Sequence, residues 1–121
     1  MKIKRIDCDF SVCKVRDFSL FDFESKYFFI GKTDGENSLV CITENVPENT
    51  VCRTDGWKAC RIEENLDFSL VGILAKISTL LAENNIGIFA ISTYNTDYIL
   101  TRKEIFDKAL AVLSDAGYEI I

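Results

Sequence analysis

The chain has 121 residues, 48% of them apolar and 27% charged, so it is long enough to bury a core as one compact unit or as two small halves sharing one. Its net charge of −5 argues against a nucleic-acid partner, which requires phosphate-neutralising Lys and Arg. No run approaches the roughly 20 apolar residues of a membrane span, so we expect no membrane partner. Asp7 and Asp9 interrupt the basic start at Met1–Arg5 before any apolar stretch, which predicts a cytoplasmic protein without a signal peptide.

The first half is predicted to consist mainly of strands. Alternating apolar and polar residues indicate half-buried strands at 3–6 and 10–15. Dense apolar runs indicate two more strands at 27–30 and 39–42, joined by a turn at Asp34-Gly35.

Two further stretches of this half are read from their turn-forming residues. Residues 17–24 fit either a single helical turn or a loop, and 46–49 is predicted to be a loop because Pro47 lacks a backbone amide. Asp55-Gly56 lies between two apolar-alternating runs, and this dipeptide favours the tight turn of a hairpin. We therefore predict a hairpin there, whose second strand starts at Trp57 and continues to Glu64.

The second half opens with a strongly periodic segment. The apolar residues between Ile73 and Leu81 fall on one face of a helix with 3.6 residues per turn. Asn84, Asn85 and Gly87 follow, and these residue types tolerate the left-handed backbone that commonly ends a helix. The pattern predicts a helix that begins near Ile73 and stops at these residues.

A hairpin and a second helix are predicted to follow. Residues 88–91 and 98–100 read as strands on either side of a turn at 95–97. Thr101–Glu104 has the hydroxyl and the Glu of a capping box, ahead of an apolar helical face. Residues 118–121 then supply a last strand that closes the sheet.

The order of these elements predicts the fold class. From Trp57 onward it is strand, helix, strand, strand, helix, strand, which is the βαββαβ order of a ferredoxin-like plait in an α+β fold. We therefore divide the chain into a strand-rich half, residues 1–56, and a plait, residues 57–121. No Gly/Ser-rich linker separates them, so we expect the halves to pack as one body.

Composition gives little support for catalysis or for a metal. The chain has no His, the commonest general base, and no Gly-rich phosphate loop. Its five cysteines contain no CxxC pair, so they are expected to be reduced and mostly buried. We therefore expect a protein that is not an enzyme, with no metal and no cofactor.

A small-ligand site has more support at the start of the first helix. The loop at 67–72 leads into the helix N-terminus, whose free amides attract an anion such as a carboxylate. The hydroxyls of Ser92, Thr93 and Thr96 and the charge of Asp97 lie at the neighbouring strand and turn, and Asp97 suits an ammonium group. Each feature has a structural alternative, because Ser69 also fits an N-cap, Gly72 a tight turn, and residues 95–97 a hairpin turn.

The same residues carry a resemblance to a known family. The series Phe68-Ser69-Leu70-Val71-Gly72-Ile73-Leu74 and Ala90-Ile91-Ser92-Thr93-Tyr94-Asn95-Thr96-Asp97-Tyr98-Ile99-Leu100 resembles the ACT-domain family. The similarity is to a subgroup of small bacterial tandem-ACT proteins that resembles the cytosolic arginine sensor, and it covers roughly residues 57–118. It implies that the first half is a degenerate ACT-like repeat, which its own periodicity does not show.

In that family the ligand site forms at a contact between two ACT domains. Carried over residue by residue, the resemblance implies ligand-binding roles for Ser69, Val71, Gly72, Ile73, Ile91, Ser92, Thr93, Thr96 and Asp97. One departure is the apolar pair Leu70-Val71, where sensor members carry a polar or acidic residue before the Gly, so an arginine-like ligand side chain does not follow.

We therefore predict an amino-acid-binding regulatory or sensor ACT protein, with the ligand at an interface between domains or subunits. Exposed edge strands of the plait and the resemblance both predict a homodimer. The alternative is a ligand-free module that serves only for dimerisation or contact with another protein.

Overall fold

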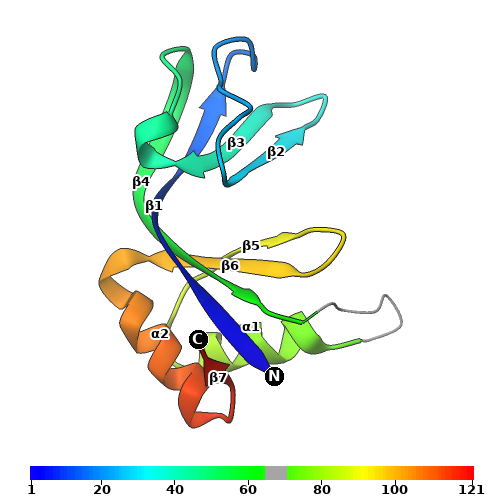
Figure 1. Ribbon diagram of the computed structural model, residues 1–121, viewed down its shortest axis with the longest axis vertical. Helices are drawn as coiled ribbons and strands as arrows, with labels where there is room; N and C mark the ends of the chain where they lie inside the picture. Colours follow the sequence, from blue (N-terminus) through cyan, green and yellow to red (C-terminus); the bar gives the residue numbers. More distant parts are fainter. Residues whose placement is uncertain (65–70) are drawn as a thin grey trace. The chain divides into compact units, whose positions relative to one another are not determined.

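The computed structural model describes residues 1–64 and 71–121 and has a mixed α/β fold (Figure 1). Its elements are, in order, β1 (Lys2–Val15), β2 (Phe28–Lys32), β3 (Asn37–Ile42), the 3-10 turn η1 (Thr43–Asn45), β4 (Thr50–Ile62), α1 (Ile73–Glu83), β5 (Phe89–Ser92), β6 (Asp97–Arg102), α2 (Lys103–Asp115) and β7 (Glu119–Ile120). The chain divides into two compact units. We call Met1–Asp7 with Lys58–Ile121 the helical unit, and Cys8–Trp57 the strand unit.

The helical unit has the predicted element order but an additional strand in its sheet. Its sheet has the order β7-β1-β4-β6-β5, so the start of β1 lies between β7 and β4. Lys2 and Ile3 pair in parallel with Glu119 and Ile120, and the Glu63 amide donates to the Lys2 carbonyl at 2.9 Å. The first seven residues therefore belong to the helical unit. The predicted division at residue 56 places them in the other half of the chain.

Both helices cover the same face of this sheet (Figure 1). Apolar residues of α1 and α2 form one buried cluster with strand residues, namely Ile3, Cys60, Ile62, Ile77, Leu81, Ile86, Ile99, Phe106, Ala109, Leu110 and Leu113. Burial of these side chains is the main stabilising contribution to the unit, at about 25 cal/mol for each Å² of apolar surface removed from water. Neither helix has the length and apolar character that a membrane crossing requires, in the part of the chain that the structure describes.

Helix α1 ends where its sequence predicts. Asn85 has a φ of 60°, its amide donates to Ala82, and the Ile86 amide donates to the Leu81 carbonyl at 3.0 Å. These two hydrogen bonds form the Schellman motif, which satisfies carbonyls that the helix leaves unpaired. The predicted stop at 84–87 is confirmed.

The predicted capping box of the second helix is wrong. Strand β6 continues through Arg102, and α2 begins at Lys103 with no side-chain capping hydrogen bond. Thr101 is only 1% exposed and its hydroxyl donates to the Arg102 carbonyl at 3.1 Å. Because the pleat of β6 turns this side chain into the interior, the hydroxyl cannot reach the helix amides.

The predicted hairpin at Asp55-Gly56 is also wrong, because β4 runs without a break from Thr50 to Ile62. Gly56 has a φ of 85°, which is typical of a bulge, whereas a type I′ turn needs two successive residues with positive φ. The Asp55 carboxylate accepts a 2.6 Å hydrogen bond from the Ser11 hydroxyl of β1, which fixes β4 alongside that strand. Strand β1 is likewise continuous, where the sequence predicted two shorter strands.

The strand unit has the sheet order β2-β3-β1-β4 and a core without a long helix. Cys13, Val15, Phe21, Leu39 and Cys41 are its buried residues on one side. Residues 17–24, which the sequence predicted as either a helical turn or a loop, form a loop of short turns. In this loop the Asp17 carboxylate accepts a hydrogen bond from the Ser19 amide at 3.0 Å.

The two units contain hairpins with the same local geometry. Strands β3 and β6 each have six residues with the same order of burial, and they begin 60 residues apart, at Asn37 and Asp97. The connecting turns match as well: the Thr33 amide donates to Glu36 at 3.0 Å, and the Thr93 amide donates to Thr96 at 2.8 Å. Both predicted hairpin turns are therefore confirmed, and they are built in the same way.

Candidate functional site

A polar cavity of about 420 Å³ lies in the helical unit, where the end of β4 meets the β5–β6 turn. Most of its lining is polar or charged, and the described residues that form it are Arg61, Ile62, Glu63, Glu64, Thr93, Asn95, Thr96 and Tyr98. Ligand pockets commonly range from about 300 to 1,000 Å³, so the cavity has room for a small molecule.

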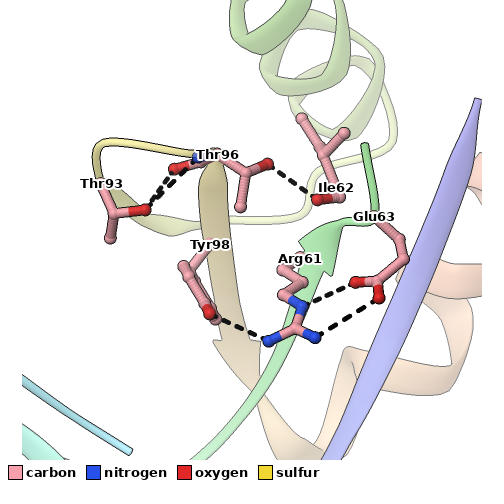
Figure 2. Close-up of polar contacts among 6 residues, drawn as sticks. All are labelled: Arg61, Ile62, Glu63, Thr93, Thr96 and Tyr98. Atoms are coloured by element: carbon pink, nitrogen blue, oxygen red, sulfur yellow. Dashed lines mark hydrogen bonds and ion pairs between the residues drawn. The ribbon is translucent and has the colours of Figure 1, made fainter. Parts of the chain in front are cut away.

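Strand alternation places the charged groups of the cavity together. Ile62 is buried under the helices, so its neighbours Arg61 and Glu63 project to the opposite face of β4. The Arg61 Nε donates to the Glu63 Oε2 at 2.7 Å, and its Nη2 donates to Oε1 at 3.4 Å (Figure 2). The remaining terminal nitrogen, Nη1, donates to the Tyr98 hydroxyl of β6 at 3.1 Å. Two strands thus hold one guanidinium.

The ion pair between Arg61 and Glu63 shifts the pKa values of both side chains so that both stay charged. Hydrogen bonds to Glu63 and then to Tyr98 raise the pKa of Arg61 above its usual value. The same hydrogen bonds from Arg61 lower the pKa of Glu63. Both side chains are about a third exposed or less, 25% for Arg61 and 33% for Glu63, so water screens the pair only in part.

Hydroxyl groups form the other side of the cavity (Figure 2). The Thr96 hydroxyl donates to the Ile62 carbonyl at 2.8 Å, and the Thr93 hydroxyl donates to the Thr96 carbonyl at 2.9 Å. These bonds connect the β5–β6 turn to the end of β4. The site therefore presents one guanidinium, two carboxylates, the hydroxyls of Thr93, Thr96 and Tyr98, and the amide of Asn95.

Of the nine predicted ligand-binding residues, Thr93 and Thr96 line the cavity. Ser92 and Asp97 are opposite each other in the hairpin, and the Ser92 hydroxyl donates to the Asp97 carboxylate at 2.5 Å. Ile91 is half-buried and pairs with Tyr98 across the same hairpin. Asp97 and Tyr98 are consecutive in a strand, so their side chains project to opposite faces and only Tyr98 is on the face of Arg61.

The predicted residues around the helix start lie elsewhere. Val71 is 88% exposed, and Gly72 precedes α1 with a φ of 80°. Ile73 is the first residue of α1, and it lines a separate hollow of about 200 Å³ with Met1 and Tyr118. Ser69 lies outside the described residues. The structure thus does not bring Val71, Gly72 or Ile73 to the described wall of the cavity.

Sequence reasoning missed the charged half of the site, because it placed Arg61, Glu63 and Glu64 in a strand and assigned none of them to a ligand. The available signal was the Arg61-Ile62-Glu63 series, in which opposite charges flank a buried residue and therefore share one face of a strand. Among residues 1–64 and 71–121, no group of three or more His, Cys, Asp or Glu side chains comes together in a way that could hold a metal ion.

Comparison with known families identifies the helical part of the chain. The family model described as ACT domain matches residues 53–115, which is more than half of the sequence. The chain belongs to the ACT domain family. The arginine-sensor subgroup is a finer assignment, and it stays a prediction.

Solved structures with this fold include an aspartate kinase and two smaller proteins. Protein Atu0741 from Agrobacterium tumefaciens aligns with a TM-score of 0.86 at 25% identity, over 99% of this chain and 91% of that one. VC0802 from Vibrio cholerae, a protein of unknown function and possible transport protein, aligns with a TM-score of 0.69 at 23% identity, over 94% and 88%. Aspartate kinase from Clostridium acetobutylicum aligns with a TM-score of 0.67 at 13% identity, over 94% of this chain but 33% of the kinase. A search of curated protein sequences finds no match.

Proposed function

We propose that this ACT protein binds a free amino acid in the cavity at the end of β4 and acts as a regulatory domain. The observation that carries the proposal is the Arg61–Glu63 pair in the cavity wall. A free amino acid carries a carboxylate and an ammonium a few ångströms apart, so its site needs a cation and an anion at similar spacing. Arg61 supplies the cation, and Glu63 and Glu64 supply the anions.

Hydrogen-bonding capacity in the cavity supports the same ligand class. Thr93, Thr96 and Asn95 provide polar groups around the charges, and they lie on a turn that is tied to β4 by the Thr96 hydrogen bond. Because these groups are held before a ligand arrives, binding loses less side-chain entropy. Most of the lining is polar or charged, which favours a small zwitterion over an apolar molecule.

Regulation is the role that membership of the ACT family supports. The C. acetobutylicum aspartate kinase is described as an allosteric enzyme, and this chain matches about a third of it. At 13% identity that likeness supports the fold alone, so the proposal of a regulatory role rests on membership of the ACT family. The proposal includes that the chain itself is not an enzyme.

We extend the proposal to the strand unit and to assembly. The shared hairpin geometry of β2–β3 and β5–β6 supports a degenerate ACT-like repeat in the first half, with η1 following β3 where α2 follows β6. Strand β5 is the last in the sheet order of the helical unit, so it presents backbone groups suited to a second copy. A homodimer with the ligand near such an interface is the arrangement we propose.

One observation favours the alternative of a ligand-free interaction module. Val71 is 88% exposed and Tyr94 is 81% exposed, and exposed apolar side chains mark protein contacts where they form a contiguous patch. Under this alternative the protein dimerises or binds a partner without any amino acid.

A thermal-shift screen against the twenty amino acids separates the two functions. A ligand at 100 times its dissociation constant stabilises the native state by about 2.7 kcal/mol, which raises the Tm by several degrees at this chain length. The matched control is the N-acetyl amide of each hit, which has neither charge and is expected to give no shift. If no amino acid at millimolar concentration raises the Tm, the interaction module is the better account.

A further inference from the structure

The guanidinium of Arg61 has hydrogen-bonding capacity that the described part of the chain does not use. An Arg side chain has five N–H donors, and the structure gives three of them partners: Nε and one N–H of Nη2 bond to Glu63, and one N–H of Nη1 bonds to Tyr98. Among residues 1–64 and 71–121, the second N–H of each terminal nitrogen has no further hydrogen-bond partner. Two such donors side by side match the two oxygens of a carboxylate in a bidentate pair.

The orientation of this guanidinium is fixed before any ligand binds. Glu63 holds one edge at 2.7 Å, the Tyr98 hydroxyl holds Nη1 at 3.1 Å, and the centre of the Tyr98 ring lies 5.9 Å from the guanidinium carbon (Figure 2). Arg61 is also part of the cavity wall. A carboxylate that enters the cavity therefore meets a cation that needs little reorganisation to bind it.

The strand unit shows that the fold does not require this arrangement. Cys13-Lys14-Val15-Arg16, at the end of β1, has the pattern of Cys60-Arg61-Ile62-Glu63, at the end of β4, with the first and third residues buried in both. Lys14 lies opposite Ser38 in the β1–β3 register, as Arg61 reaches Tyr98, and β3 is equivalent to β6. The tetrapeptide Asp-Phe-Ser-Leu also follows both patterns, at 17–20 and at 67–70.

At the equivalent positions the strand unit has Lys14, Arg16 and Ser38, so it has two cations and no acid. Its strand β3 nevertheless has the same length and burial order as β6. The β2–β3 hairpin thus forms with Lys14 and Arg16 at the positions that Arg61 and Glu63 have in the helical unit. The arrangement of Arg61, Glu63 and Tyr98 is specific to the unit that contains the polar cavity.

We propose that Arg61 binds the carboxylate of the amino-acid ligand, and that Glu63 and Tyr98 are positioning residues that fix its guanidinium. This inference rests on the proposed function and goes beyond it, because it assigns the carboxylate to a side chain in β4 and not to the N-terminus of α1. It also sets selectivity: a ligand needs a free carboxylate, so amides, esters and decarboxylated amines are excluded.

The test is a titration followed by nuclear magnetic resonance of the Arg Nε–H groups in nitrogen-15-labelled protein. The Arg61 signal is assigned as the one that Arg61→Lys removes, and the probes are glycine, acetate, methylammonium and any amino acid found by thermal shift. We expect acetate and glycine to shift the Arg61 signal to saturation and methylammonium to leave it unchanged.

Arg53 provides a matched control in the same strand. Its Nε donates to Asp55 at 3.1 Å and its Nη2 at 3.4 Å, so it has a similar bond to an acid two residues away, but it does not line the cavity. Its signal is expected to stay unchanged. For an amino acid that binds, Arg61→Met is expected to weaken binding by about tenfold or more, and Arg53→Met to leave it unchanged. Circular dichroism melts check that both variants are folded.

Each outcome decides one of the two proposals. If an amino acid shifts the backbone amides of Thr93 and Thr96 but not the Arg61 side chain, and Arg61→Met binds it normally, the carboxylate role of Arg61 is overturned and the binding function stands. If acetate shifts Arg61 but no amino acid stabilises the protein, the Arg61 site stands and the amino-acid function is overturned. If no probe affects Arg61, Thr93 or Thr96, both are overturned.

Discussion

Arg61, near the end of β4, and Glu63, just after that strand, are two residues apart, and their side chains meet at 2.7 Å in the wall of the cavity. Arg53 and Asp55 repeat the same spacing eight residues earlier, at 3.1 Å. The difference lies in the surroundings: the Arg61 side chain is 25% exposed and reaches Tyr98, whereas that of Arg53 is 44% exposed. Partial burial makes the first pair the stronger electrostatic feature.

Acid is expected to destabilise the protein through its paired carboxyls. Hydrogen bonds from Arg61 hold the pKa of Glu63 below its ordinary value of 4.5, and the Ser11 hydroxyl, followed by Arg53, holds that of Asp55 below 3.8. A carboxyl whose pKa is lower in the folded state adds stability above its unfolded pKa, and this stability is lost as the pH falls through the folded pKa. Urea denaturation at a series of pH values should therefore show a decrease in the free energy of unfolding that begins below about pH 4.5. The Glu63→Gln and Asp55→Asn variants should show a smaller decrease, and profiles identical to the parent's would refute the linkage.

The thiols are expected to fall into distinct reactivity classes. Cys13, Cys41 and Cys60 are buried, as predicted for most of the five, but Cys52 is exposed. Burial raises the pKa of Cys60 to about 12, so its reactive thiolate is scarce at neutral pH. A thiol reagent followed by mass spectrometry should label Cys52 first and the three buried residues only on unfolding. Rapid labelling of Cys60 in native protein is the result that would count against this burial.

Gly72 is expected to need its left-handed backbone. Its φ is 80°, and no atom lies within 4 Å of where a Cβ would stand, so an added methyl group is opposed by conformation and not by crowding. Gly72→Ala should therefore cost about 1–2 kcal/mol in the free energy of unfolding. Gly87→Ala is the matched control, because Gly87 also has open space but an ordinary φ. Thermal melts should show a lower Tm for the first variant alone, and equal Tm values would contradict the argument.

Asp97→Asn tests whether the sequence-based interpretation of this residue is correct. Asp97 accepts the Ser92 hydroxyl at 2.5 Å and lies on the other face of β6 from Tyr98, so we expect the variant to bind an amino acid with unchanged affinity. Asn keeps an acceptor for Ser92, so stability should also change little. Titration calorimetry measures the affinity. An affinity that is lower by about tenfold or more would instead support the contact between Asp97 and the ligand ammonium group that the sequence predicted.

Local patterns predicted the elements of this fold better than their connections. The periodicity from Ile73 and the left-handed tendency of Asn85 both act within one helix, and both predictions are confirmed. Asp55-Gly56 was misread because the choice between a turn and a bulge depends on Ser11, which lies 44 residues away in β1. A sequence window contains no information about that partner.

The same limit applied to the candidate site. Thr93 and Thr96 were predicted as ligand-binding residues because a turn can be recognised from adjacent residues in the sequence. Arg61 was missed because its role depends on Tyr98, 37 residues later in another strand. The insertion of β1 between β7 and β4 was missed for the same reason, since strand order is set by long-range pairing.

The central claim is that the cavity beside Arg61 binds a free amino acid through its charged groups. Its most direct test is titration calorimetry of the amino acid that gives the largest thermal shift, compared with the carboxamide of the same amino acid. We expect saturable binding of the amino acid and binding of the carboxamide that is weaker by about tenfold or more, because a charge-assisted hydrogen bond contributes about 1.5–3 kcal/mol. Equal affinity for the two compounds, or no measurable binding of any of the twenty amino acids, would contradict it.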